Sequence, residues 1–199
     1  NRIGRWVAER VCRDLAALQD PYFDDLHVHL NMAASEFANP ALPDELGAQV
    51  AAHGLRPRRL ALELTEGMLM KRPEQVMPVM QALRERGFAI SLDDFGTGFS
   101  SLTYLQRLPL RELKIDRSFV SQIHEKDGLA MVAAVMSLAD ALGLEAVAEG
   151  VEHPYQVRAL TELGCTTGQG FLLGHPAELA DAVTARPVLP SQRRALSRV

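Results

Sequence analysis

The chain of 199 residues carries 21 Lys and Arg against 25 Asp and Glu, a formal net charge of −4. This length suits one domain with a sizeable core rather than two, and the acidic balance argues against a basic face of the kind that binds duplex nucleic acid. No apolar run approaches the roughly 20 residues of a membrane-spanning helix. We therefore expect neither duplex nucleic acid nor a membrane as a partner of this chain.

Two cysteines, Cys12 and Cys165, lie far apart and match no metal-binding or redox spacing. The chain also lacks a signal-peptide pattern, so we predict reduced thiols and a cytoplasmic location. A membrane anchor, in a longer parent protein, would lie outside this chain. The chain begins Asn1-Arg2-Ile3 without an initiator Met, which indicates a piece of something longer.

Apolar residues recur at helical spacing from Ile3 to Leu18, which predicts a helix over 3–19. After it, short β-like runs alternate with helical patterns, several of which end near glycine. Strands are expected over 26–32, 59–65, 88–93, 111–115, 144–149 and 167–172, and further helices over 43–53, 73–86, 100–107, 127–142 and 153–163.

This alternation implies parallel strands joined by helical crossovers, so the class is α/β. The choice lies between an open doubly wound sheet and a closed barrel. Polar residues follow nearly all six strands, which favours a modified (β/α)8 TIM-type barrel with six of the eight strands in this chain. Such barrels typically need ~250 residues, so we expect the other two strands before Asn1. We predict an N-terminally incomplete domain over 1–186 and a flexible tail over 187–199.

The residues at the strand ends form the candidate site. A single acidic residue there is commonly a helix N-cap, but several carboxylates converging on one barrel mouth would repel one another without cations. Oxygen ligands of this kind suit Mg²⁺ or Mn²⁺. The strand-end residues are Asn31, Glu63, Glu66, Asp93, Asp94, Lys114, Glu149, Glu152 and Gln169.

Adjacent aspartates suggest a two-metal hydrolytic site. Asp93 can bridge two ions while Asp94 reaches the second, at the ~4 Å spacing that phosphodiester-cleaving sites use. Lys114 could orient the attacking water or stabilise charge, and Glu149 could be the general base.

Other polar features are interpreted as structural. The segments Gly96-Thr97-Gly98 and Gly168-Gln169-Gly170 lack the full dinucleotide fingerprint, which argues against a Rossmann fold. His27 and His29 alternate onto one strand face, and we interpret them as packed or hydrogen-bonded rather than as metal ligands.

Five segments, in this order, resemble the EAL domain family of bacterial cyclic di-GMP phosphodiesterases. The resemblance extends from about Ile3 to Pro176. The segments are LELTE at 62–66, DDFGTGFSSL at 93–102, LKIDRSFV at 113–120, AEGVE at 148–152 and QGF at 169–171.

The resemblance implies a modified barrel in which two Mg²⁺ or Mn²⁺ ions activate a water that cleaves cyclic di-GMP to linear pGpG. The resemblance also implies roles position by position. Asn31, Glu63 and Asp93 correspond to ligands of the first metal, and Asp94 corresponds to the residue on the second-metal side. Lys114 corresponds to the lysine near the water, Glu149 to the base and Gln169 to a late active-site amide, while Glu66 and Glu152 correspond to acidic residues that support the loop and the metal surroundings.

One departure is the absence of a Glu-Ala-Leu motif, whose glutamate is a metal ligand in the family. We expect that motif upstream, and weak or no hydrolysis by this chain alone. The alternative is a catalytically inactive module that binds cyclic di-GMP or a partner. Another Mg²⁺-dependent barrel enzyme, such as an enolase-like lyase, fits the ordered motifs poorly. A homodimer and an upstream sensor or GGDEF-type domain are further expectations.

Overall fold

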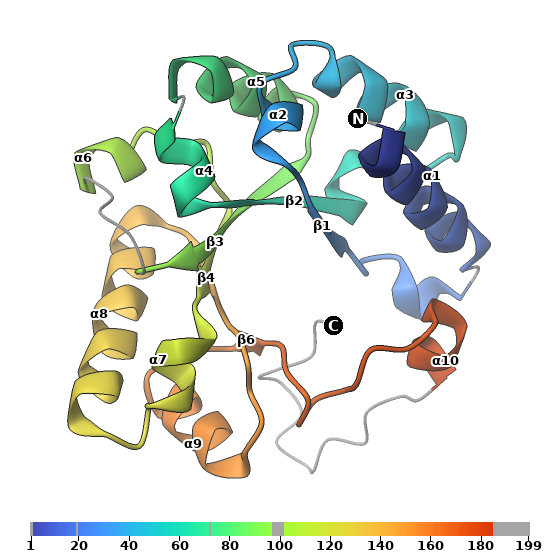
Figure 1. The fold of residues 1–199 in the computed structure, drawn as a ribbon. Helices are drawn as coiled ribbons and strands as arrows, with labels where there is room; N and C mark the ends of the chain where they lie inside the picture. The colour runs from blue at the N-terminus through green and yellow to red at the C-terminus, as the bar shows by residue number, and fades with distance from the viewer. Residues whose placement is uncertain (1, 19, 72, 97–101, 185–199) are drawn as a thin grey trace. The chain divides into compact units, whose positions relative to one another are not determined.

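The computed structural model describes residues 2–18, 20–71, 73–96 and 102–184 (Figure 1). Its contacts divide the chain into two compact units. The first unit comprises Asn1–Asp93 and Gly98–Arg111, and the second comprises Asp94–Thr97 and Glu112–Val199. In both units parallel strands alternate with helices along the chain, which confirms the predicted α/β class.

The first unit contains three parallel strands and most of the helices. Its elements are α1 (Arg2–Ala17), the 3-10 helix η1 (Pro21–Phe23), β1 (Val28–Asn31), α2 (Ala34–Phe37), α3 (Leu42–Ala52), the 3-10 helix η2 (Pro57–Arg59), β2 (Leu60–Thr65), α4 (Glu66–Lys71), α5 (Pro73–Glu85), β3 (Ala89–Phe95, whose last two residues belong to the second unit) and α6 (Leu102–Leu105).

The strands of the first unit pair in a register that separates an apolar face from a polar one. Leu62 and Leu64 of β2 pair with Ile90 and Leu92 of β3, and all four side chains are at most 2% exposed. Burying an aliphatic side chain of this size stabilises a fold by about 1.5–3 kcal/mol. Because side chains alternate along a strand, the residues between these four point to the opposite face.

The second unit has three short parallel strands, with α8 packed against β4 and β5. Leu113 and Ile115 of β4 are fully buried, and Val132 and Val135 lie on the buried side of α8. The elements are β4 (Glu112–Ile115), α7 (Arg117–Ser121), α8 (Lys126–Leu142), β5 (Glu145–Ala148), α9 (Pro154–Glu162), β6 (Thr167–Gly168) and α10 (Leu179–Thr184).

Most predicted elements are present within one or two residues of their expected bounds, but the last strand is much shorter. The sequence predicted a strand over 167–172, whereas β6 ends at Gly168. Gln169 N still donates to Ala148 O of β5, but from there the backbone bonds to the loop after β5, where Gln169 O accepts from Val151 N and Leu172 N donates to Val151 O. The strand over 88–93 was instead too short, since β3 continues to Phe95. The predicted tail over 187–199 lies outside the described residues.

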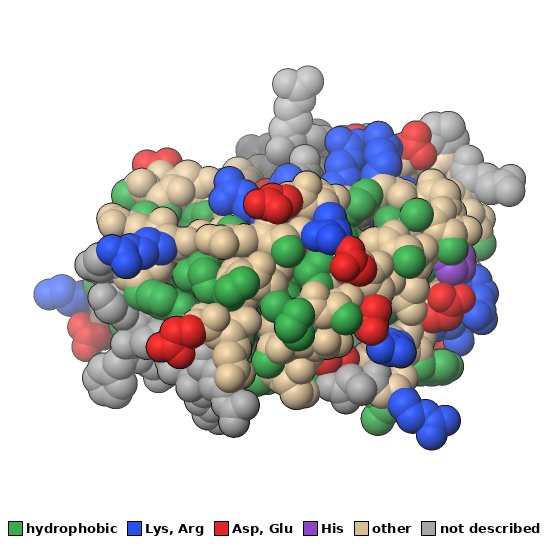
Figure 2. All heavy atoms as spheres, turned by 90° about the horizontal axis from the view of Figure 1, so that it is seen from above, with side chains coloured by type: hydrophobic (Ala, Val, Ile, Leu, Met, Phe, Trp, Pro, Cys, Tyr) green, Lys and Arg blue, Asp and Glu red, His purple; other side chains and the backbone are tan. Residues whose placement is uncertain are grey.

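The face shown in Figure 2 carries charges of both signs, and both cysteines are free, as the sequence predicted. Acidic and basic side chains are interspersed among apolar ones on the face shown in Figure 2. Among the described residues, no helix combines the length and apolarity that crossing a bilayer requires. Cys12 and Cys165 are buried free thiols, and burial raises the pKa of both.

Two glycines test how the loop after β5 is packed. Gly143 and Gly150 both have a φ of 66°, but a Cβ at Gly143 would meet nothing within 4 Å, whereas one at Gly150 would lie 2.6 Å from Cβ of Arg117. We expect Gly143→Ala to lower the free energy of unfolding by about 1 kcal/mol through left-handed strain. Gly150→Ala should cost about 1–3 kcal/mol more through overpacking. Urea denaturation followed by circular dichroism measures both, and equal losses would contradict the proposed contact with Arg117.

Candidate functional site

The polar face of the first unit carries the three residues that were predicted to hold the first metal. Asn31 pairs with Glu63 in register, Glu63 pairs with Ser91, and Asp93 pairs with Thr65 two residues beyond Glu63. Since paired residues of parallel strands share a face, Asn31, Glu63 and Asp93 lie on one side of the sheet. Asn31 is exposed, Asp93 is half-buried, and Glu63 is 2% exposed.

The buried Glu63 carboxylate has a hydrogen-bond partner on the neighbouring strand. Nδ1 of His29 lies 2.7 Å from Oε1 of Glu63. Burying a carboxylate is costly unless hydrogen bonds or opposite charges compensate it, and His29 supplies such compensation. The interpretation of His29 as a hydrogen-bonded residue is confirmed.

The chemistry of this face fits a divalent cation. Its donors are an amide oxygen from Asn31 and carboxylate oxygens from Glu63 and Asp93, the ligand types that Mg²⁺ and Mn²⁺ prefer. Between Glu63 and Asp93, Ser91 is fully buried, and its Oγ has no hydrogen-bond partner among the described residues. An unsatisfied hydroxyl beside a ligand set is expected where a cation with its water ligands completes the site.

Asp94 holds an unusual backbone conformation. Its φ is 56°, and it is the one non-glycine residue with a positive φ among those the structure describes. Aspartate is among the few residues that tolerate this region. Residues in this conformation concentrate at functional sites, and Asp94 holds it one residue before the end of β3.

The second unit brings the predicted catalytic residues into contact. Nζ of Lys114 lies 2.5 Å from Oε1 of Glu149, and Nε2 of Gln169 donates to the same oxygen at 2.6 Å. These side chains come from β4 and from the ends of β5 and β6. The Lys114 side chain is 3% exposed and that of Glu149 is 14% exposed, so the ion pair is largely removed from water.

The two supporting acids lie in different surroundings. Glu66 begins α4 and is 2% exposed. Glu152 is exposed and lies in the loop after β5. That loop is held by Gln156, whose Oε1 accepts from the backbone N of Glu152 at 2.7 Å and of His153 at 2.8 Å, while its Nε2 donates to Val120 O.

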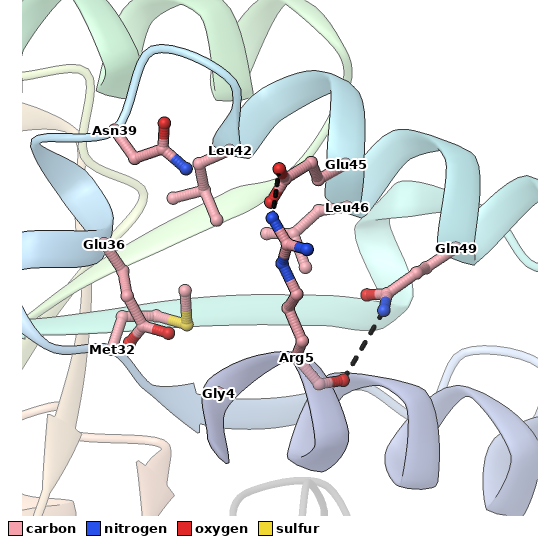
Figure 3. A pocket seen from close by; sticks show the side chains of 9 residues that line it. All are labelled: Gly4, Arg5, Met32, Glu36, Asn39, Leu42, Glu45, Leu46 and Gln49. Atoms are coloured by element: carbon pink, nitrogen blue, oxygen red, sulfur yellow. Dashed lines mark hydrogen bonds and ion pairs between the residues drawn. The ribbon is translucent and has the colours of Figure 1, made fainter. Parts of the chain in front are cut away.

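The first unit has two cavities, and they differ in whether a predicted site residue lines them. A hollow of about 40 Å³ lies among α1, α2 and α3, where Arg5 pairs with Glu45 and Gln49 donates to Arg5 O (Figure 3). It contains none of the predicted site residues and has room only for a water or two. A second hollow of about 210 Å³ borders Asn31 and is walled by Ile3 and Val7 of α1.

The predicted residues thus form two sets, one in each unit. Asn31, Glu63 and Asp93 share a face of the first, and Lys114, Glu149 and Gln169 make mutual contacts in the second. Sequence reasoning did not assign Ser91 to the site, nor His29 to Glu63. The alternation of Ser91 with Asp93, and of His29 with Asn31, was the available signal.

Comparisons with known proteins agree with the motif order. A family model described as EAL domain matches residues 1–176. The chain is 43% identical over 176 residues to the bifunctional diguanylate cyclase/cyclic di-GMP phosphodiesterase MucR of Pseudomonas aeruginosa, covering 88% of this chain and 26% of that protein. It is 38% identical to the oxygen sensor protein DosP of Escherichia coli, covering 87% and 22%. The chain therefore spans about a quarter of the length of such relatives.

Solved structures give the same result. The MucR phosphodiesterase in complex with c-di-GMP matches with a TM-score of 0.86 at 41% identity, covering 91% of this chain and 74% of that one. The EAL domain of Mycobacterium smegmatis DcpA matches with a TM-score of 0.86 at 32% identity, covering 92% and 83%. This likeness confirms the predicted TIM-type barrel class, to which this chain contributes six described strands.

The Lys114–Glu149 pair should be strongly coupled. Removing one member of a buried ion pair typically costs about 3–5 kcal/mol, because the other charge remains buried. We expect Lys114→Met and Glu149→Gln each to lower the free energy of unfolding. The double variant should lose less than the sum of the two losses by at least about 1 kcal/mol. Urea denaturation in EDTA measures this cycle.

The exposed Arg5–Glu45 pair is the matched control. The side chain of Arg5 is 62% exposed and that of Glu45 is 34% exposed, so Arg5→Met and Glu45→Gln should couple by less than about 1 kcal/mol. Additive losses at Lys114 and Glu149 would contradict a functional ion pair.

Proposed function

Because this chain belongs to the EAL domain family, we propose that it forms the greater part of a catalytic domain that hydrolyses cyclic di-GMP to linear pGpG. The contact of Glu149 with Lys114 and Gln169 carries the proposal, because it places an oriented carboxylate at the ends of adjacent strands. Relatives named as cyclic di-GMP phosphodiesterases, MucR and NbdA, support the substrate.

The residues present fit two divalent ions. Asn31, Glu63 and Asp93 would hold the first and Asp94 would contribute to the second. Mg²⁺ or Mn²⁺ there would neutralise the phosphodiester charge and activate a water. The oxygen-only donor set favours these ions over zinc.

Residues of the second unit would accept the proton of the attacking water. Lys114 and Gln169 both contact Oε1 of Glu149, so the carboxylate is held in one orientation. The Lys114 ammonium stabilises the ionised form of that carboxylate, which is the form that accepts a proton from the attacking water. Glu149 would then act as general base and Lys114 would orient it, with Gln169 as a second positioning contact.

The supporting roles of Glu66 and Glu152 remain proposals. Glu66 is buried at the start of α4, directly after β2, where a carboxylate is favoured by the helix dipole. Glu152 lies in the loop after Glu149, whose backbone Gln156 holds. Both positions suit residues that keep the strand ends and their loops in place.

The Glu-Ala-Leu motif that the family uses is not in this sequence. The outer edge of β1 pairs with no strand among the described residues of the first unit. The hollow of about 210 Å³ beside Asn31 has apolar walls from Ile3, Val7 and Leu30. We propose that a strand carrying this motif pairs with β1, fills the hollow and adds a carboxylate beside Asn31.

The absent motif also supports a second candidate function, a module that binds cyclic di-GMP without cleaving it. Loss of one metal ligand would reduce hydrolysis far more than binding through the remaining residues. An upstream sensor or GGDEF-type domain, a homodimer and a cytoplasmic location are further proposals. The multidomain size of the relatives supports the first of these.

A direct assay separates hydrolysis from binding. Cyclic di-GMP is incubated with Mn²⁺ and either the 199-residue chain or the same chain extended upstream in its gene through the preceding strand. Liquid chromatography then measures pGpG. We expect turnover by the extended protein and at least about 100-fold less by the chain alone, because one ligand is missing. Glu149→Gln in the extended protein should reduce turnover by roughly 10²–10⁴-fold, as removal of a general base does.

The alternative outcomes are distinct. Calorimetric binding of cyclic di-GMP with no pGpG from the extended protein would replace the enzyme by the binding module. Equal turnover by both proteins would refute the need for the additional strand. No binding and no turnover would refute both functions.

A further inference from the structure

His29 contacts Glu63, one of the three residues proposed to hold the first metal ion. His29 lies on β1, two residues before Asn31 and on the same face. Its register partner on β2 is Ala61, whose methyl group leaves room for the imidazole to lean towards Glu63, two residues further along β2. The Nδ1–Oε1 distance of 2.7 Å is that of a strong hydrogen bond.

The ionisation state of the Glu63 carboxylate determines which of the two side chains donates this hydrogen bond. An ionised carboxylate, the form that binds a cation, only accepts hydrogen bonds, so towards that form Nδ1 of His29 is the donor. The Glu63 side chain is 3% exposed and that of His29 is 23% exposed. The bond therefore lies mostly out of water, where a hydrogen bond to a charged group fixes orientation more strongly than at the surface.

A carboxylate that accepts through one oxygen can coordinate a cation through the other. Partners of this kind set the angle of a metal-binding carboxylate, and their loss commonly weakens metal affinity by 10–100-fold. Glu63 has a particular need of such a partner, because it is buried beside two less buried donors, Asn31 and Asp93.

We propose that His29 is a positioning residue for the metal site, and that its Nδ1–H holds the Glu63 carboxylate in the orientation that binds the divalent cation. The proposal rests on the proposed function for the identity of the ligand, a divalent cation, but not on hydrolysis. His29 contacts no substrate in this role and acts only through Glu63.

The test measures Mn²⁺ affinity without nucleotide, by electron paramagnetic resonance of free Mn²⁺ in titrations of the 199-residue chain. His29→Leu keeps the bulk but removes the donor, and we expect a 10–100-fold weaker dissociation constant. His29→Asn loses bulk but keeps a donor N–H, because its amide nitrogen is separated from Cβ by the same number of bonds as Nδ1. It should remain within about threefold of the unmodified chain.

Controls locate the effect. Glu63→Gln should abolish the measured binding, and His53→Leu, which removes a histidine at the end of α3, should leave it unchanged. Circular dichroism establishes that each variant folds. A purely space-filling role predicts the reverse order, with His29→Leu tolerated and His29→Asn impaired, and that result would overturn the proposal.

Two further outcomes separate this proposal from the proposed function. No Mn²⁺ binding by the unmodified chain, or binding unaffected by His29→Leu, would overturn the role of His29. Normal dependence of Mn²⁺ affinity on His29, together with no pGpG from the extended protein, would reject hydrolysis and leave the positioning role standing.

Discussion

In-register parallel pairing determines where the functional side chains of this chain can lie. In the first unit, pairing of Asn31 with Glu63 and of Glu63 with Ser91 puts polar side chains on one face of three strands. The intervening Leu62 and Ile90 are thereby committed to the core. A slip of one residue would exchange the two faces, burying Glu63 in the apolar core and exposing leucines. The hydrophobic core thus determines the positions of the polar side chains, because the register that buries Leu62 and Ile90 is also the one that puts Asn31, Glu63 and Ser91 on one face.

This arrangement removes carboxylates from water, which is unfavourable unless they have partners, and the two units supply different partners. Glu63 receives a hydrogen bond from His29, while Glu149 receives a cation and an amide from Lys114 and Gln169. A fixed cation suits the role proposed for Glu149, a base that must stay ionised. A hydrogen-bond donor that adds less positive charge suits the role proposed for Glu63, a metal ligand, since a second full cation there would oppose the metal ion.

The sequence predicted the ends of β1, β2, β4 and β5 to within one residue, because polar residues there break an apolar pattern, whereas the ends of β3 and β6 were wrong. Asn31, Asp93 and Glu149 needed only their place after a strand. The helix over 100–107 was predicted and contains α6, but the short helices α2, α4, α7 and α10 were missed. Of these, α7 had a signal in Asp116, whose carboxylate caps it by accepting from Ser118 N. The alternation of His29 with Asn31 placed both on one strand face, but it did not identify Glu63 as the partner of His29, because that contact depends on the register of β1 and β2.

Two side chains of α7 lie against glycines in segments that follow candidate site residues. The motif that follows β4 places Phe119 against Gly96, where a Cβ would lie 2.7 Å from the ring, and Arg117 against Gly150. Gly96 directly follows β3, two residues after Asp94, and Gly150 directly follows Glu149. A single short helix therefore packs against the segments that follow Asp94, a proposed metal-site residue, and Glu149, the proposed base. A larger residue at either glycine would push on α7, so α7 couples the positions of these two segments.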